Sequence, residues 1–193
     1  FERYRRSFDA SFGHPAAVLE TAAEVAGVVL GKSPIGVMVI ILHIELMTQD
    51  HYTQSVKTDT SIDPLFATLL EKHWLEESQH ARIDALELAR LVNTATPAQI
   101  DQGITDYCDL LGAFDGLLKM QAEMDVSTLG AVVGRAFDEK EAAAIVAAQH
   151  AGYRRTFLVA GIRNTQFAGV IEKMGAGRAD DVARLGDAFS SGT

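Results

Sequence analysis

The hydrophobic and polar positions alternate along this chain with a helical period. Apolar residues recur three and four positions apart through most of the sequence. The dipeptides Ser33-Pro34, Asp63-Pro64 and Thr96-Pro97 each resemble an N-cap residue followed by proline at the first helical position. Helices are therefore predicted over the ranges 34–56, 64–93, about 105–133 and 139–162.

The remaining stretches extend this helical prediction toward both ends of the chain. Residues 16–30, which follow Pro15, have helical spacing and stop at Gly31. The tail contains shorter helical pieces at 167–174 and 180–189. The Val and Ile content of range 34–56 would also suit a buried strand, but more than twenty residues is too long for a strand. The pattern predicts one all-α domain over 1–193, with its core at about 34–162 and no linker.

Composition narrows the classes of protein to consider. The 193 residues are enough for one domain, and the net charge of −9 without a basic patch argues against a nucleic-acid partner. The longest apolar run, residues 35–42, is far shorter than the ~20 residues that span a bilayer, so no membrane partner is predicted. A single cysteine, Cys108, excludes an internal disulfide framework and favours a reducing compartment, so a cytoplasmic protein is expected.

The candidate chemistry lies in residues 71–90, which read EKHWLEESQHARIDALELAR. On an α-helix His73, Glu77, His80 and Asp84 share one face, because they are four, three and four residues apart. Glu77 and His80 can reach the same point beside the helix, and Asp84 could orient the His80 ring. Burying such a face is costly unless a cation compensates it. The alternative is an ordinary polar stripe that faces solvent.

Counting residues from the turns places further ionisable groups at matched heights. Glu45 lies fifteen residues before a turn near Thr60 and Glu77 lies seventeen after it, so in an antiparallel hairpin they meet within ~3 Å along the axis. Similarly, Glu123 and His150 lie thirteen and fourteen residues from a turn near 136. These counts predict that carboxylates and imidazoles from separate helices converge inside the domain.

A weak internal repeat relates the two halves of the chain. Glu45 precedes His73 by 28 residues, and Glu123 precedes His150 by 27. In the second copy Arg154 takes the place of Glu77, and Phe157 takes the place of His80. The second half therefore lacks the Glu-x-x-His pair.

Glutamate on one helix followed by Glu-x-x-His on the next resembles the ferritin-like di-iron carboxylate proteins. His73 with Glu77 and His80 is similar to the His-x-x-x-Glu-x-x-His helix of their p-aminobenzoate N-oxygenase-like branch. The resemblance covers about residues 34–162. It implies a ferritin-like four-helix bundle with extra N- and C-terminal helices and an oxidoreductase that activates O₂ on a small substrate. It also implies two iron ions held by Glu45, His73, Glu77, His80, Glu123 and His150. Mixed carboxylate and imidazole ligands would also accept manganese or zinc. From helix spacing, Asp84 and Arg154 are expected around the ligands, although a guanidinium beside a cation is unfavourable.

Several alternatives stay open at this point. The family's carboxylate three residues before His150 is replaced by Ala147, and Arg154 could pair with Glu77 or Glu123 in a metal-free bundle. A ferritin-like binding protein without catalysis, a structural or partner-binding relative, a haem-oxygenase-like helical fold and a homodimer are also compatible with the sequence. His14, His43 and His51 are not expected to be ligands, and Asp115 is expected to face water. The predicted cavity beside the site is lined by Met38, Ile41, Met120, Met124 and Val146.

Overall fold

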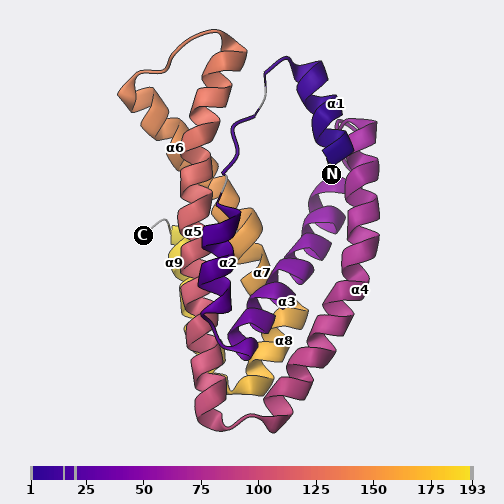
Figure 1. Ribbon diagram of the computed structural model, residues 1–193, viewed down its shortest axis with the longest axis vertical. Coiled ribbons are helices and arrows are strands. Elements are labelled where there is room, and N and C mark those ends of the chain that lie inside the picture. Colours follow the sequence, from indigo (N-terminus) through magenta and orange to yellow (C-terminus); the bar gives the residue numbers. More distant parts are fainter. Residues whose placement is uncertain (1, 15, 20, 192–193) are drawn as a thin grey trace.

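The computed structural model describes residues 2–14, 16–19 and 21–191, and in this part of the chain it contains helices and no strand (Figure 1). None of the described helices combines the length and the apolar character that crossing a bilayer requires. The helices are α1 (Glu2–Phe12), α2 (Ala22–Leu30), α3 (Pro34–His51), α4 (Pro64–Thr94), α5 (Pro97–Val133), α6 (Glu139–Tyr153), α7 (Ala160–Arg163), α8 (Thr165–Met174) and α9 (Ala176–Ser191), with π-helical segments η1 (Tyr52–Val56) and η2 (Arg154–Val159).

The predicted helix starts at residues 34 and 64 are confirmed, whereas the third long helix begins at Pro97, directly after its N-cap Thr96, and not at about residue 105. The side chains of Ser33, Asp63 and Thr96 each accept a hydrogen bond from the backbone three residues further on. Thr96 also forms a reciprocal capping box with Gln99. From there α5 runs without a break to Val133, although Gly103, Gly112 and Gly116 would have permitted a kink. The local sequence therefore determines where the long helices begin.

Helix α3 occupies the centre of the fold. It packs along α4 on one side and α5 on the other, and α7 and α8 also contact it (Figure 1). Helix α5 in turn packs against α6, and α8 packs against α9. Buried side chains of these helices and of η2 form an apolar cluster, which includes Val39, Leu42, Leu88, Tyr107, Leu111, Leu158, Phe167 and Ile171.

Two glycines allow α3 and α5 to approach closely. A Cβ atom on Gly103 would overlap the side chain of Ile35, and one on Gly36 would overlap Cβ of Asp106. Asp106, although buried, accepts a 2.9 Å hydrogen bond from the backbone N–H of Ser33. This contact ties the start of α3 to α5 and sets the level at which the later residues of α3 lie.

The helix predicted over 16–30 is shorter in the structure. Residues 16–19 are not helical, α2 begins at Ala22, and residues 15 and 20 lie outside the described part. The Gln121 side chain of α5 donates a 2.9 Å hydrogen bond to the Ala17 carbonyl and accepts one from the Leu19 N–H. These contacts with α5 replace the bonds that a helix would have supplied. The prediction failed here because tertiary contacts outweighed local propensity.

The helix predicted over 139–162 is interrupted by a π-helical segment. Helix α6 continues directly into η2 and then into α7, which ends at Arg163. A π-helix forms i to i+5 hydrogen bonds and so contains more residues per turn than an α-helix. The interruption changes the direction of every side chain after Tyr153 relative to a straight helix. The two tail helices, α8 and α9, are present and longer than predicted.

Candidate metal centre

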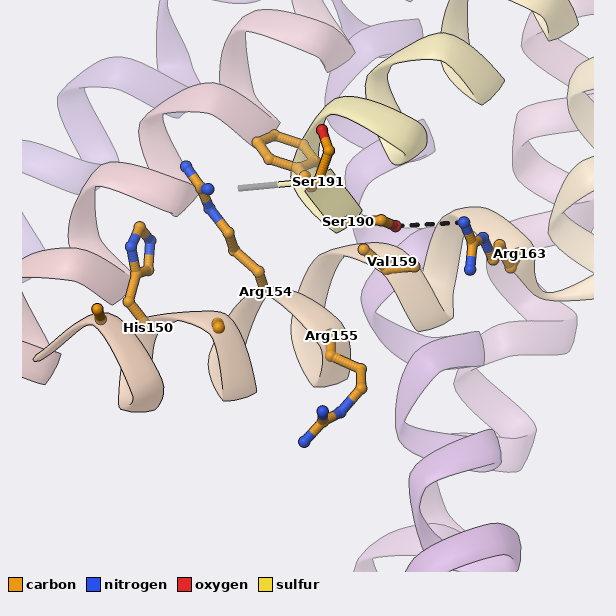
Figure 2. Close-up of a pocket in the computed structure, with 10 residues that line it drawn as sticks. His150, Arg154, Arg155, Val159, Arg163, Ser190 and Ser191 are labelled. Atoms are coloured by element: carbon orange, nitrogen blue, oxygen red, sulfur yellow. Dashed lines mark hydrogen bonds between the residues drawn. The ribbon is translucent and has the colours of Figure 1, made fainter. Parts of the chain in front are cut away.

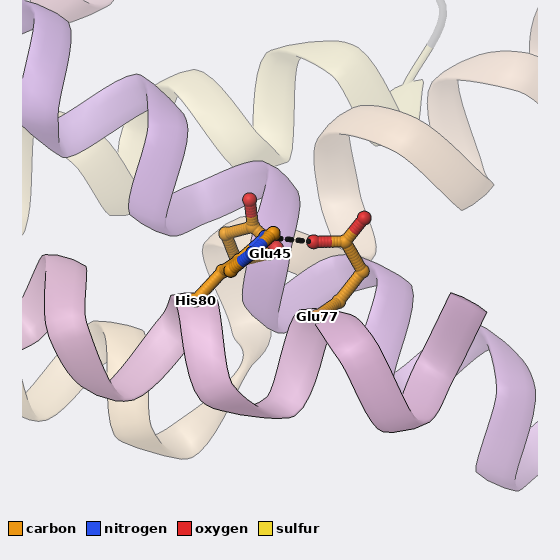
Figure 3. A group of neighbouring side chains, drawn as sticks. All are labelled: Glu45, Glu77 and His80. Atoms are coloured by element: carbon orange, nitrogen blue, oxygen red, sulfur yellow. Dashed lines mark hydrogen bonds and ion pairs between the residues drawn. The ribbon is translucent and has the colours of Figure 1, made fainter. Parts of the chain in front are cut away.

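Glu45, Glu77 and His80 come together between α3 and α4 (Figure 3). One ligand atom from each of these side chains lies within 4.8 Å of the other two. The two helices run antiparallel across a short connection, so Glu45 meets Glu77 at one level, as the residue count from the turn predicts. The three side chains offer a metal ion two carboxylate groups and one imidazole ring.

Glu77 is at the centre of the hydrogen bonds in this group. Its Oε1 atom lies 2.7 Å from His73 Nδ1, and its Oε2 atom accepts a 2.8 Å hydrogen bond from His80 Nδ1. The Glu77 side chain is 15% exposed, whereas that of His80 is 48% exposed. The group is therefore closed on the Glu77 side and open to solvent at His80.

Glu45 has a buried oxygen without a partner. Its Oε2 atom is shielded from solvent and forms no hydrogen bond with any residue in the described part of the chain. Burying an oxygen of a carboxylate in this way is unfavourable unless another group compensates it. The Glu45 side chain belongs to the only group of described side chains that could hold a metal ion, and a cation bound to this oxygen would satisfy it.

Burial and the neighbouring charges shift the pKa values of the carboxylic acids in this region. Burial raises the pKa of Glu45 to about 8, helped by a hydrogen bond to Glu77 and by the charges of Glu77 and Asp84. Burial also raises the pKa of Glu77, but its hydrogen bonds with Glu45 and His80 outweigh this effect and leave its pKa below the ordinary value. The pKa of Asp84 is raised by burial, and the Glu77 charge adds to this shift. Without a cation, these opposite shifts favour one proton shared between the two glutamates.

The second pair predicted from residue counting does not join this group. Glu123 is exposed on α5, beside the fully buried Ala122. His150 instead donates a 2.8 Å hydrogen bond to Asp115, and neither it nor Glu123 contributes an atom to the candidate centre. Matching heights placed Glu123 and His150 at a common level but could not show which way a side chain on α5 points.

The expectation for Asp115 was wrong, and the pair of Arg154 with Glu77 or Glu123, which was left open as an alternative, is not formed. Arg154 pairs with Asp115 through Nε and Nη2, each 2.7 Å from a carboxylate oxygen, and not with Glu77 or Glu123. Asp115 does not face water, because its side chain is only 16% exposed between Arg154 and His150. Burial raises the pKa of Asp115, but the hydrogen bonds from these two residues outweigh it and the net shift is downward. The second half of the chain therefore contains a compensated ion cluster.

His43 has a structural role that the sequence did not reveal. Its ring is fully buried, and its Nε2–H donates a 2.9 Å hydrogen bond to the Phe157 carbonyl in η2. The carbonyl can only accept, so Nδ1 is unprotonated and accepts a 2.9 Å bond from the Tyr107 hydroxyl. Burial lowers the pKa of His43 to about 4 and outweighs the opposing effect of the Phe157 carbonyl. The only available sequence signal was that His43 and Glu45 point to nearly opposite sides of one helix.

The predicted cavity is present only in part. Ile41 and Met120 line an apolar cavity of about 540 Å³ between α2, α3 and α5. Met38, Met124 and Val146 do not line it, and Met38 packs against the core instead. None of the three grouped side chains lines this cavity either. The prediction that these five residues enclose a space next to the carboxylates was therefore wrong.

We found no protein-family model, no curated protein and no solved structure that matches this chain. The resemblance to the di-iron carboxylate proteins accordingly depends on the motif residues and on the geometry described above.

Proposed function

We propose that this chain is a metal-dependent oxidoreductase that holds one divalent cation between α3 and α4. Glu45, Glu77 and His80 would be the ligands. The observation that carries the proposal is the buried Oε2 atom of Glu45, which has no hydrogen-bond partner among the described residues and belongs to the side chain grouped with Glu77 and His80. The proposal includes a ferritin-like four-helix bundle formed by α3 to α6. The substrates would be O₂ and a small molecule.

The donor set suits a single ion. Two glutamates neutralise a divalent charge, and mixed carboxylate and imidazole ligation is compatible with iron, manganese or zinc. Because Glu123 and His150 lie outside the group, the proposal is for one ion and not for the two that the family resemblance implies. Iron is preferred because three protein ligands leave coordination positions open, and a bound iron ion supplies O₂ activation.

The surrounding residues would hold these ligands in place. His73 lies 2.7 Å from the Glu77 carboxylate and restrains its orientation. Asp84 adds a further negative charge whose effect reaches Glu77 and Glu45. His80, the most exposed ligand, marks the side from which an ion or a small substrate would enter.

Removal of either carboxylate should abolish tight metal binding. Titration of the metal-free protein with Fe²⁺ under anaerobic conditions, and separately with Mn²⁺ and Zn²⁺, should show one equivalent bound. Glu45→Gln and Glu77→Gln should each weaken the affinity by at least about tenfold, because a carboxylate ligand becomes a neutral amide. Isothermal titration calorimetry and elemental analysis would measure both quantities.

Glu76→Gln is the matched control, because Glu76 is an exposed neighbour of Glu77 on the same helix. It should bind metal as the wild type does. The proposal fails if every metal binds far below one equivalent, or if the control loses as much affinity as the two ligand variants. Oxygen consumption by the iron-loaded protein with a reductant would then separate an oxidoreductase from a ferritin-like binding protein.

One observation favours a second candidate, a metal-free protein with a structural or partner-binding role. In the second half, the positions equivalent to Glu77 and His80 hold Arg154 and Phe157, and Arg154 is neutralised by Asp115. Thermal stability is compared between the wild type and Glu77→Ala in a buffer that contains the metal. If the first half is also metal-free, the substitution should leave the stability unchanged or raise it. Loss of a bound ion should instead lower it.

A further inference from the structure

A second cavity lies where η2 and α7 meet the end of α9 (Figure 2). Its volume is about 560 Å³. Among the residues that line it, three are arginines and one is a histidine, namely Arg154, Arg155, Arg163 and His150. The apolar part of the lining comes from Ala147, Ala151, Val159 and Phe189.

The π-helical segment explains why these arginines share one cavity. In a straight α-helix Arg154 and Arg163, nine residues apart, would point to opposite sides. In η2 the turn widens, so residue 159 comes closer to the face of residue 154, and residue 163 follows one α-helical turn later. Arg154, Val159 and Arg163 thereby all reach the same cavity.

The charges of this cavity are only partly compensated. Arg154 is held by Asp115, with its guanidinium 5.6 Å from the centre of the Phe189 ring. Arg163 contacts Asp187 and Ser190 only at 3.3 and 3.2 Å through a single nitrogen, and the Asp187 side chain is 79% exposed.

Arg155 has no ion-pair or hydrogen-bond partner within residues 2–14, 16–19 and 21–191. No aspartate or glutamate is among the described lining residues. In a chain with a net charge of −9, this is a locally cationic cavity.

We propose that this cavity binds a small organic anion, whose charge is attracted by the incompletely compensated guanidinium groups of Arg155 and Arg163 and whose short apolar body lies along Val159 and Phe189. Guanidinium groups with free N–H donors favour carboxylate and phosphate oxygens. The mixture of a few polar groups and an apolar wall is typical of small-ligand sites. The site is separate from the candidate metal centre, because it shares no residue with Glu45, Glu77 and His80.

Calorimetric titration of the metal-free protein with hexanoate tests this proposal at low ionic strength. Hexanoate should bind saturably in the millimolar range or tighter, and added salt should weaken it. Hexan-1-ol has a similar apolar body without the charge and should bind roughly tenfold more weakly or not at all. Inorganic phosphate should bind more weakly than hexyl phosphate, because it lacks the apolar body.

Arg155→Gln and Arg163→Gln should each weaken hexanoate binding by roughly three- to tenfold, the range expected for a partly exposed charge-assisted contact. Both side chains are exposed, so the variants should fold; circular dichroism would verify this. Arg82→Gln on α4 is the matched control and should bind hexanoate as the wild type does.

The proposal would be overturned if hexanoate does not bind saturably or binds no more tightly than hexan-1-ol. It would also be overturned if Arg155→Gln, Arg163→Gln and the control Arg82→Gln all bind hexanoate with the same affinity. Equal affinity for phosphate and hexyl phosphate would overturn the part that concerns the apolar body. Metal binding is not measured here, so failure of this proposal leaves that of the metal centre unaffected.

Discussion

Replacing His43 with alanine is expected to lower the free energy of unfolding by about 3–5 kcal/mol. The variant leaves the Tyr107 hydroxyl and the Phe157 carbonyl without the partner that each now has at 2.9 Å. Tyr107 is fully buried, so its lost hydrogen bond is not replaced by bulk water. The ring also packs edge-on against Phe167, with the centroids 5.3 Å apart, and its removal leaves a cavity. Urea-induced unfolding would measure the loss.

His14→Ala is the control for this experiment, because His14 is exposed and should change stability by no more than about 0.5 kcal/mol. A substitution at Gly161 provides a second test of the packing around His43. A Cβ atom on Gly161 would overlap the His43 ring, so Gly161→Ala should cost about 1–3 kcal/mol in the wild type but less in the His43→Ala background. If the two substitutions were additive, or if His43→Ala cost no more than His14→Ala, this description of the core would be wrong.

Acidification from neutral pH to about pH 4 is expected to remove about 3 kcal/mol of stability through His43 alone. In the unfolded chain a histidine titrates near its ordinary pKa of 6.5, whereas burial lowers the pKa of His43 to about 4 in the folded protein. Between these values the unfolded state binds a proton that the folded state does not. The contribution of His43 therefore falls as the pH falls through this window and is constant above it. Urea unfolding at a series of pH values would measure it.

The comparison with His43→Gln isolates this contribution. Glutamine can still donate to the Phe157 carbonyl and does not titrate. Glu45 acts in the opposite direction, because burial raises its pKa to about 8 and its contribution is lost as the pH rises. It is present in both proteins and cancels in the difference, and the pKa of Tyr107 is raised well above this range by burial. The same dependence on pH in wild type and variant would show that His43 is not held neutral.

Local sequence determined most of the helices. An N-cap side chain and a following proline act within a few residues, so Ser33, Asp63 and Thr96 mark helix starts whatever surrounds them. The level of Glu45 with respect to Glu77 was also predictable, because a short connection between two antiparallel helices leaves little freedom in their relative height.

The tertiary structure decided which way side chains face and where tertiary contacts override the local preference for a regular α-helix. Residue counting could not distinguish exposed Glu123 from Asp115, since the face of α5 that meets α6 depends on how the two helices pack. The side chain of Gln121 keeps the Ala17 backbone out of a helix. The π-helical turn at η2, which carries the carbonyl bound by His43 and gathers the arginines, likewise has no marker in the sequence.

The sequence by itself therefore determined that the described part of the chain is helical without strands, and that Glu45, Glu77 and His80 meet. Capping depends on neighbouring residues only, and helix rise adds up residue by residue. Only the tertiary structure decided that the second half holds Asp115 between Arg154 and His150 and that His43 is buried neutral. These outcomes depend on the rotation and close packing of helices distant in sequence, and helical spacing does not specify that rotation.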